Sequence, residues 1–197
     1  MKPRTFVFFG IMGSGKGTQV KLLMDFLKAK DGKESVYAGT GEGFRKLIAS
    51  DNFTAKLVKD CMNRGDLVAD FLTTTIVANT LISSLTPEKH LFTDGYPRNI
   101  TQSQDFEKMM EFYERENIVV ISIEIGREEA IKRNKLRGRE DDTEEGFLRR
   151  FNVYMNNVVP AINYFKDKKD YEIYTINGEQ SIENVHKDII SKLGFSY

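Results

Sequence analysis

Residues 10–18, GIMGSGKGT, place a lysine among four closely spaced glycines. The segment fits the pattern GxxxxGK, with Thr18 one place later than the usual Ser or Thr. The glycines allow a tight turn in which successive backbone N–H groups point at phosphate oxygens. The lysine would reach the β- and γ-phosphates, and a following helix would add its positive N-terminal end. The segment therefore predicts a nucleotide-phosphate site made by Gly13, Ser14, Gly15, Lys16, Gly17 and Thr18.

Such a loop needs a buried strand before it and a helix after it, and the sequence predicts both. Thr5–Phe9 is a continuous apolar run, which is typical of a strand that is buried on both faces of a parallel sheet. Apolar residues then recur at helical spacing over residues 18–30. The motif therefore has the structural context that its chemistry requires.

The rest of the chain repeats this alternation of strands and helices. Further strands are expected at residues 35–38, 91–93, 118–125 and 171–176. Helices are expected at residues 42–64 with a break near 50–52, at 70–85, 101–116 and 127–136, from Thr143 onward with an interruption near Pro160, and at 182–193. Asp70 and Ser181 are the expected N-caps of two of them. The pattern predicts an α/β fold with a five-stranded parallel sheet flanked by helices, whose ligand lies beyond the carboxyl ends of the strands.

Composition narrows the classes of function. The 197 residues include 29 Lys+Arg and 29 Asp+Glu, so the formal net charge is zero. Broad electrostatic binding to nucleic acid is therefore not expected, and an anion site must be built locally. The single cysteine, Cys61, excludes an intrachain disulfide and a cysteine-built zinc site. No apolar run is long enough to predict a membrane span. We expect one soluble domain that acts in the cytoplasm without a nucleic-acid or membrane partner.

The variant GSGKGTQ at residues 13–19 resembles the adenylate kinase family of nucleoside monophosphate kinases. Further motifs follow in the family's order: GTGEGFR at 39–45, GDLV at 65–68, DGYPR at 94–98, and RGREDD at 137–142 with Arg150 after it. The resemblance covers nearly the whole chain. It implies a P-loop NTPase fold and a single kinase domain over residues 1–197, with a monophosphate-binding arm at 39–68 and a short lid at 136–142.

The resemblance implies how the acceptor nucleotide is held. Thr40 would lie against the base of AMP, and Gln102 would read its adenine edge. Arg45 and Arg98 would hold the acceptor phosphate. The full set that the resemblance implies for AMP is Thr40, Arg45, Asp66, Leu67, Val68, Gly95, Tyr96, Pro97, Arg98, Gln102, Arg139 and Arg150.

The donor side follows from the same resemblance. Arg133 would cover the ATP base, which the backbone near Gln180 would also touch, and Arg137 would hold the ATP phosphates. Asp94 would organise Mg²⁺, mainly through water. The catalytic set is then Lys16, Arg98, Arg139 and Arg150, the last two bridging donor and acceptor phosphates. The short lid has no cysteine, so Mg²⁺ is the only metal expected and zinc is not.

Electrostatics favours the same residues. Phosphoryl transfer between two nucleotides brings together roughly six negative charges, of which one Mg²⁺ cancels about two. The site therefore needs about four or more cations at one point. Arginine suits this task because its planar fork pairs two phosphate oxygens and keeps its charge. The candidates are Lys16, Arg45, Arg98, Arg137, Arg139 and Arg150.

We therefore expect a monomeric ATP:AMP phosphotransferase that binds ATP, AMP and ADP and converts ATP plus AMP into two ADP. Thr40 and Gln102 favour AMP, and a UMP/CMP kinase is the alternative. A non-catalytic nucleotide sensor and a P-loop hydrolase are further alternatives. Gly43 stands where the family has a larger apolar residue, which predicts looser packing under the acceptor base.

Overall fold

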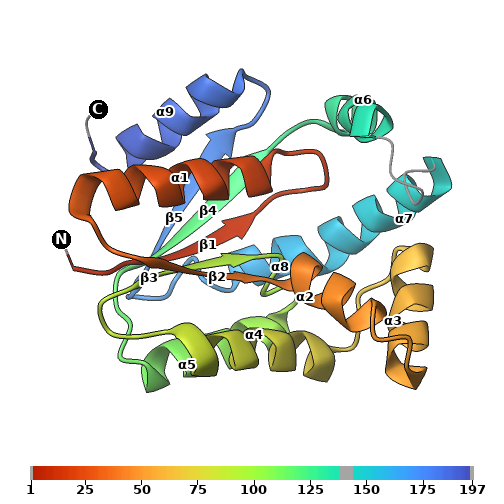
Figure 1. The fold of residues 1–197 in the computed structure, drawn as a ribbon. Coiled ribbons are helices and arrows are strands. Elements are labelled where there is room, and N and C mark those ends of the chain that lie inside the picture. The colour runs from red at the N-terminus through yellow and green to blue at the C-terminus, as the bar shows by residue number, and fades with distance from the viewer. Residues whose placement is uncertain (1, 138–143, 196–197) are drawn as a thin grey trace.

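The computed structural model describes residues 2–137 and 144–195. Five parallel strands form one sheet in the order β2-β3-β1-β4-β5 (Figure 1). The strands are β1 Thr5–Phe9, β2 Ser35–Gly39, β3 His90–Asp94, β4 Ile118–Glu124 and β5 Tyr171–Asn177. The predicted five-stranded parallel sheet is therefore confirmed.

Helices cover both faces of the sheet (Figure 1). One face carries α1 (Lys16–Asp31) and α9 (Ile182–Lys192), and the other carries α4 (Asp70–Ser84), α5 (Ile100–Phe112) and α8 (Val159–Asn163). The helices α2 (Thr40–Ile48) and α3 (Phe53–Arg64) lie beyond the carboxyl end of β2, and α6 (Arg127–Arg137) follows β4. Helix α7 (Glu144–Val153) leads through a π-helical turn, η1 (Tyr154–Val158), into α8.

Side chains alternate between two cores because successive residues of a strand point to opposite faces. Phe6 and Phe8 of β1 are buried with Leu23 of α1 and Ile189 of α9. The opposite core contains Val7 and Phe9 of β1 with Val77, Leu81, Phe106, Met110, Ala161 and Phe165. Both faces of β1 are thus apolar, which fixes the strand that leads into the phosphate loop.

The break in the predicted 42–64 helix is confirmed. Helix α2 ends at Ile48, and Asp51 has a φ of 47°. Asn52 then caps α3, because its side-chain oxygen accepts from Ala55 N at 2.8 Å. The turn separates two short helices that together form an arm beside the sheet.

The predicted interruption near Pro160 is also confirmed, and its form is a π-helical turn. Val159 N donates to Tyr154 O, five residues back, instead of the usual four. Pro160 lies in the first turn of α8, where its missing N–H is tolerated. The widened turn therefore lets one long helix pass the proline. The predicted start of this helix, Thr143, lies outside the described residues.

His90 at the start of β3 is fully buried and neutral. Its Nδ1 accepts from Arg4 N at 3.0 Å, so its Nε2 carries the proton and donates to Asp31 Oδ2 at 3.2 Å. Burial lowers the pKa of His90, and the nearby Asp31 carboxylate opposes this only partly.

Candidate functional site

The phosphate loop follows the carboxyl end of β1. Three of its glycines have φ values between 83° and 151°, a region that L side chains rarely adopt. At Gly10 a Cβ would lie 2.5 Å from Ser14 Oγ and 2.6 Å from Ile123 O, so the turn is closed tightly against β4. Lys16 begins α1, and its Nζ donates to the carbonyl oxygens of Gly10 and Ile11. A lysine ammonium and a helix N-terminus thus meet at one point.

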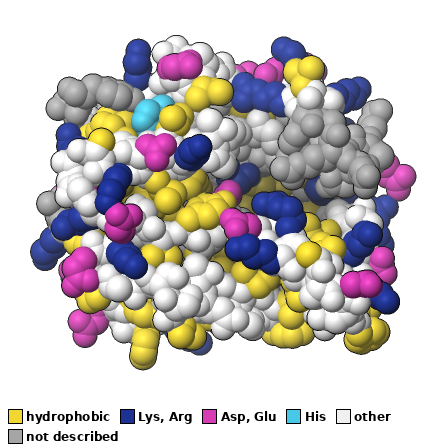
Figure 2. Space-filling model, viewed as in Figure 1, with side chains coloured by type: hydrophobic (Ala, Val, Ile, Leu, Met, Phe, Trp, Pro, Cys, Tyr) yellow, Lys and Arg dark blue, Asp and Glu magenta, His cyan; other side chains and the backbone are white. Residues whose placement is uncertain are grey.

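A cleft of about 770 Å³ opens over this loop. Its walls come from the phosphate loop, the ends of β2 and β3, the arm and the helices α6 and α7. Figure 2 shows this face, where Lys and Arg side chains surround the hollow in its middle. Among the described residues, five basic side chains line the cleft against three acidic ones. The basic ones are Lys16, Arg45, Arg98, Arg133 and Arg150, and the acidic ones are Glu42, Asp66 and Asp94.

Most of the predicted ligands that the structure describes line this cleft. For the donor these are Gly13, Gly15, Lys16, Gly17, Thr18 and Arg133, and for the acceptor Arg45, Asp66, Leu67, Gly95, Pro97, Arg98 and Arg150. Ser14, Thr40, Val68, Tyr96 and Gln102 are buried and do not line the cleft. Arg139 and the side chain of Arg137 lie outside the described residues, as does most of the predicted lid.

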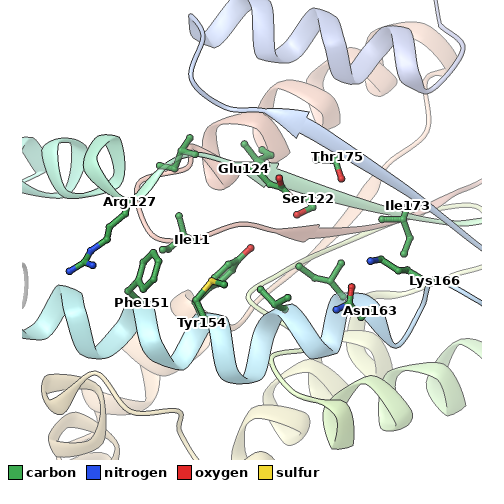
Figure 3. A pocket seen from close by; sticks show the side chains of 15 residues that line it. Ile11, Ser122, Glu124, Arg127, Phe151, Tyr154, Asn163, Lys166, Ile173 and Thr175 are labelled. Atoms are coloured by element: carbon green, nitrogen blue, oxygen red, sulfur yellow. The ribbon is translucent and has the colours of Figure 1, made fainter.

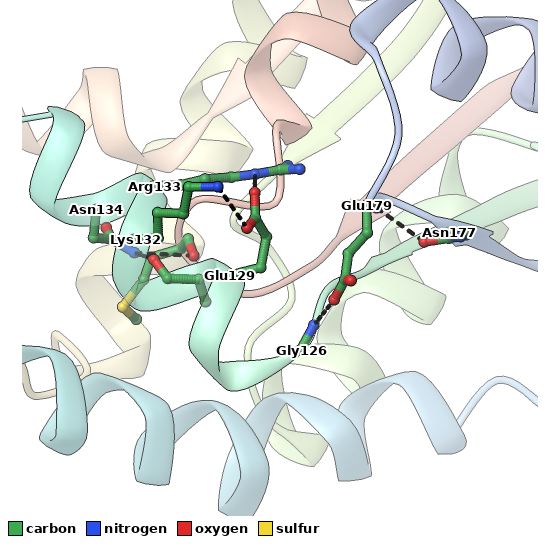
Figure 4. A network of polar contacts seen from close by, with 9 residues as sticks. Gly126, Glu129, Lys132, Arg133, Asn134, Asn177 and Glu179 are labelled. Atoms are coloured by element: carbon green, nitrogen blue, oxygen red, sulfur yellow. Dashed lines mark hydrogen bonds and ion pairs between the residues drawn. The ribbon is translucent and has the colours of Figure 1, made fainter.

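Gln180 lies apart from the cleft lining, in the loop between β5 and α9. Its Nε2 donates to Asn177 O at 3.0 Å and to Asp188 Oδ2 at 2.7 Å. The neighbouring Glu179 accepts from Gly126 N at 2.6 Å, which ties this loop to the end of β4 (Figure 4). The expected contact between the backbone near Gln180 and the ATP base stays a prediction.

Arg133 is held by an ion pair within α6. Its Nε donates to Glu129 Oε1 at 2.7 Å, while Lys132 lies 3.6 Å from the other oxygen of the same carboxylate (Figure 4). Asn134, on the same helix, donates from Nδ2 to Met12 O at 3.2 Å. Helix α6 therefore fixes both a cleft-lining cation and the far side of the phosphate loop.

Arg150 joins three parts of the site. It lies on α7, lines the cleft, and donates from Nε to Met12 Sδ at 3.4 Å in the phosphate loop. A Cβ at Gly65, where the arm's helix α3 ends, would lie 3.0 Å from Arg150 Cγ. The same arginine thus lies against both the phosphate loop and the end of α3, which is the position that a cation between two bound phosphates would need.

Arg98 and Thr40 meet at Gly95, just past the end of β3. Arg98 Nε donates to Gly95 O at 2.7 Å, and Thr40 Oγ1 donates to the same oxygen at 3.0 Å. A Cβ on Gly95 would lie 2.6 Å from Thr40 Oγ1 and 2.7 Å from Arg98 Nη2, so only glycine fits. Burial lowers the pKa of the Arg98 guanidinium, although the charge of Asp94 opposes this. A phosphate anion would compensate the lost hydration of this cation.

The amide of Gln102 is held in one orientation. Arg98 N can only donate, and it donates to Gln102 Oε1 at 2.8 Å. Asp70 Oδ1 accepts from Gln102 Nε2 and from Asn99 Nδ2, both at 2.8 Å. These bonds leave one N–H and one lone pair of the amide unused, and the side chain is buried beneath the cleft lining.

The expected capping role of Asp70 was wrong. Ala69 is the N-cap of α4, and Asp70 is the first helical residue. Its carboxylate instead accepts hydrogen bonds from Gln102 of α5 and from Asn99, the N-cap of α5. The negative charge still lies in the first turn of α4, where the helix dipole favours it.

The packing expected at Gly43 also differs from the prediction. A Cβ at this position would lie 2.3 Å from Ile76 Cγ2 of α4. The isoleucine therefore fills the space that a larger residue would occupy, and α2 packs closely on α4.

Asp94 ends β3 beside the phosphate loop. Its Oδ2 lies 3.9 Å from the position that a Cβ on Gly17 would take, and it accepts from Tyr37 Oη at 3.1 Å. Burial, with the nearby Asp94 charge, raises the pKa of the tyrosine. A carboxylate at a phosphate-binding loop fits Mg²⁺, which binds through one or two carboxylates, phosphate oxygens and water.

A second cavity of about 400 Å³ lies between the β4–β5 face of the sheet and the α7–α8 helix (Figure 3). Ser122, Thr175 and Ile173 come from the strands, and Tyr154 comes from η1. Tyr154 also lines the large cleft, so its ring forms part of the wall between the two. Burial raises the pKa of its hydroxyl to about 12.

Sequence reasoning missed several groups that shape the cleft. Tyr37, Asn134 and Glu129 belong to no recognised motif. Tyr37 and Asn134 contact distant segments, whereas Glu129 pairs with Arg133 one turn along the same helix. Two signals were available in the sequence: Tyr37 stands two residues before the GTGEGFR motif, and Glu129 stands four residues before Arg133, the spacing of a helical ion pair.

Comparisons with known proteins agree with this geometry. The family model described as adenylate kinase matches residues 8–170. The chain is 35% identical to an adenylate kinase of Prochlorococcus marinus (strain MIT 9301), covering 95% of this chain and 97% of that protein. It is 30% identical to an adenylate kinase of Thermosipho africanus (94% and 97% covered) and 32% identical to one of Bacteroides thetaiotaomicron (93% and 94%). No helix in the described ranges has the length and apolar character needed to cross a membrane.

Proposed function

Because this chain belongs to the adenylate kinase family, we propose that its cleft passes the γ-phosphoryl group of ATP directly, in line, to the phosphate of AMP. The activity is that of a nucleoside monophosphate kinase, in which ATP and AMP give two ADP. One observation carries the assignment of this activity to the cleft. Five basic side chains surround the phosphate loop, and they come from separate elements that converge there.

The role of each basic side chain follows from its position in the cleft. Lys16 and the N-terminus of α1 hold the donor phosphates, as a lysine and helix end at a glycine-rich turn do elsewhere. Arg45 and Arg98 hold the acceptor phosphate, and Arg150 stabilises the charge that develops between the two. Arg133 covers the donor base, while Arg137 and Arg139 complete the charge from the lid.

The acceptor base is AMP's adenine, read by Gln102. The free N–H and the free lone pair of its amide are complementary to the ring nitrogen and the amino group on an adenine edge. The fixed orientation of this amide supports the proposal, and because Gln102 is buried, the side chains that cover it must move aside before an adenine reaches it. Thr40 keeps the arm joined to the Arg98 segment by its bond to Gly95 O.

Asp94 organises Mg²⁺, which supplies charge neutralisation on the phosphates when bound. Residues 39–68 are the monophosphate-binding arm and residues 136–142 the short lid. Closure of both would exclude water, so that ATP is not hydrolysed in place of phosphoryl transfer to AMP. We propose that the enzyme acts as a monomer. We place the enzyme in the cytoplasm, with Mg²⁺ as its only metal.

The test compares two neighbouring arginines. Arg150→Ala removes the bridging cation, and we expect kcat to fall by about 10²–10³ with a much smaller change in ATP affinity. Arg149→Ala is the matched control, because Arg149 is exposed and paired with Glu145 at 3.0 Å. Its kcat should stay within about twofold of the parent. Equal losses in both variants, or no loss in Arg150→Ala, would reject the assigned role.

A further inference from the structure

The ends of two neighbouring strands bring Tyr37, Gly39 and Asp94 together. Strands β2 and β3 pair in parallel with Gly39 opposite Asp94 and Tyr37 opposite Phe92. Tyr37 and Gly39 are two residues apart, so their Cβ positions fall on the same face of the sheet. Tyr37 and Asp94 are therefore diagonal neighbours across the pair, within reach of a long aromatic side chain.

The ring of Tyr37 lies over Gly39. A Cβ at position 39 would be 2.5 Å from Cε1, Cζ and Oη of the tyrosine, closer than two such atoms can approach. Gly39 has φ −92° and ψ 112°, an extended conformation that any residue adopts. The backbone therefore does not require glycine here, and the space taken by the ring does.

The tyrosine hydroxyl reaches the site's metal-organising carboxylate. Tyr37 Oη donates to Asp94 Oδ2 at 3.1 Å, and the residue, which is 36% exposed, lines the large cleft. A hydrogen bond to an ionised carboxylate is stronger than one between neutral groups. It engages Oδ2, which is also the Asp94 oxygen that lies near Gly17 of the phosphate loop.

We propose that Tyr37 is a positioning residue for the Asp94 carboxylate, and that Gly39 is glycine because it makes room for this contact. The inference rests on the proposed function in one respect, that Asp94 organises hydrated Mg²⁺. Without the hydroxyl, the carboxylate would rotate about its side-chain bonds, and part of the Mg²⁺ binding energy would go into orienting it. A ring that only packed would serve equally well as phenylalanine.

The first experiment measures the forward rate against free Mg²⁺ at fixed ATP and AMP. For Tyr37→Phe we expect the Mg²⁺ concentration at half-maximal rate to rise about tenfold, the size of one hydrogen bond to a charged group. ATP affinity in the absence of Mg²⁺ should stay within about twofold. Tyr174→Phe is the matched control, because its hydroxyl bonds Glu172 at 2.7 Å on the edge strand β5, outside the cleft lining. Its Mg²⁺ profile should match the parent.

The second experiment tests Gly39 by a double-mutant cycle. Gly39→Ala displaces the ring and should raise the Mg²⁺ requirement as Tyr37→Phe does. In a Tyr37→Ala background the added methyl meets no ring, so Gly39→Ala should change nothing further. Circular dichroism and thermal denaturation check that each variant is folded.

The outcomes separate the two claims. If the parent forms ADP and the Tyr37→Phe enzyme has the same Mg²⁺ profile, the positioning role is overturned while the proposed function stands. A Gly39→Ala effect of equal size in both backgrounds overturns the role of Gly39. If the parent itself forms no ADP from ATP and AMP, the proposed function fails instead.

Discussion

Replacing Asp70 tests how the amide of Gln102 is held. In Asp70→Ala, Gln102 Nε2 and Asn99 Nδ2 both lose their acceptor at 2.8 Å. Gln102 is only 1% exposed, so water cannot replace that partner, whereas Asn99 is partly exposed and can be hydrated. An unsatisfied buried donor costs about 1–3 kcal/mol. In a domain of this size each kcal/mol lowers the melting temperature by about 2–4 °C.

At about 2 kcal/mol, the middle of that range of free energies, we expect the melting temperature of Asp70→Ala to be roughly 4–8 °C lower. The released amide can rotate, so the KM for AMP should rise by about tenfold while the KM for ATP stays nearly constant. Asp70→Asn keeps an acceptor oxygen without its charge, and it should show about half of each effect. Initial rates with AMP or ATP varied, together with thermal denaturation, measure these quantities.

The matched control is Asp188→Ala. Asp188 also accepts from a glutamine Nε2, that of Gln180 at 2.7 Å, but on the exposed side of α9. Its loss should change stability by less than about 0.5 kcal/mol and leave the KM for AMP unchanged. The reasoning is refuted if Asp70→Ala is as stable as the control, or if it raises both KM values equally.

Three further predictions concern the parts around the cleft. Gly43→Met should destabilise the arm by about 1–3 kcal/mol through its clash with Ile76, and Ile76→Ala should relieve most of that loss; denaturant titrations of the double variant check this. Asn134→Ala removes the bond to the phosphate loop, so the KM for ATP should rise several-fold while the KM for AMP is unchanged, as measured by initial rates. The depressed pKa of buried His90 means that the unfolded chain binds a proton more readily; stability should fall as the pH drops below about 6.5, and His90→Gln should flatten this slope in thermal melts between pH 5 and 7.5.

The sequence was a good guide wherever the signal was local. The strand, glycine-rich turn and helix of the phosphate loop are contiguous, so their order predicted a strand at 5–9 and a helix over 18–30, where the structure has Thr5–Phe9 and Lys16–Asp31. The break at 50–52 and the interruption near Pro160 were also readable, because each depends on residues within one turn of the break.

Contacts between distant segments were not readable in this way. Asp70 has the type and place of a helix cap, yet its carboxylate serves Asn99 and Gln102 about 30 residues away. The missing side chain of Gly43 predicted loose packing, because the neighbouring sequence does not show that Ile76 fills the space beside this glycine. Both cases depend on how two helices approach each other, which a local pattern does not encode.

The most direct test of the central claim is ADP formation from Mg·ATP with AMP, UMP, CMP, GMP or no acceptor. Direct transfer to AMP in a cleft that excludes water predicts fast turnover with AMP, slow turnover with the other monophosphates and very slow turnover in the blank. A faster rate with UMP or CMP would contradict the role of Gln102 in reading the acceptor base. ATP consumption in the blank at the rate seen with AMP would contradict direct transfer itself.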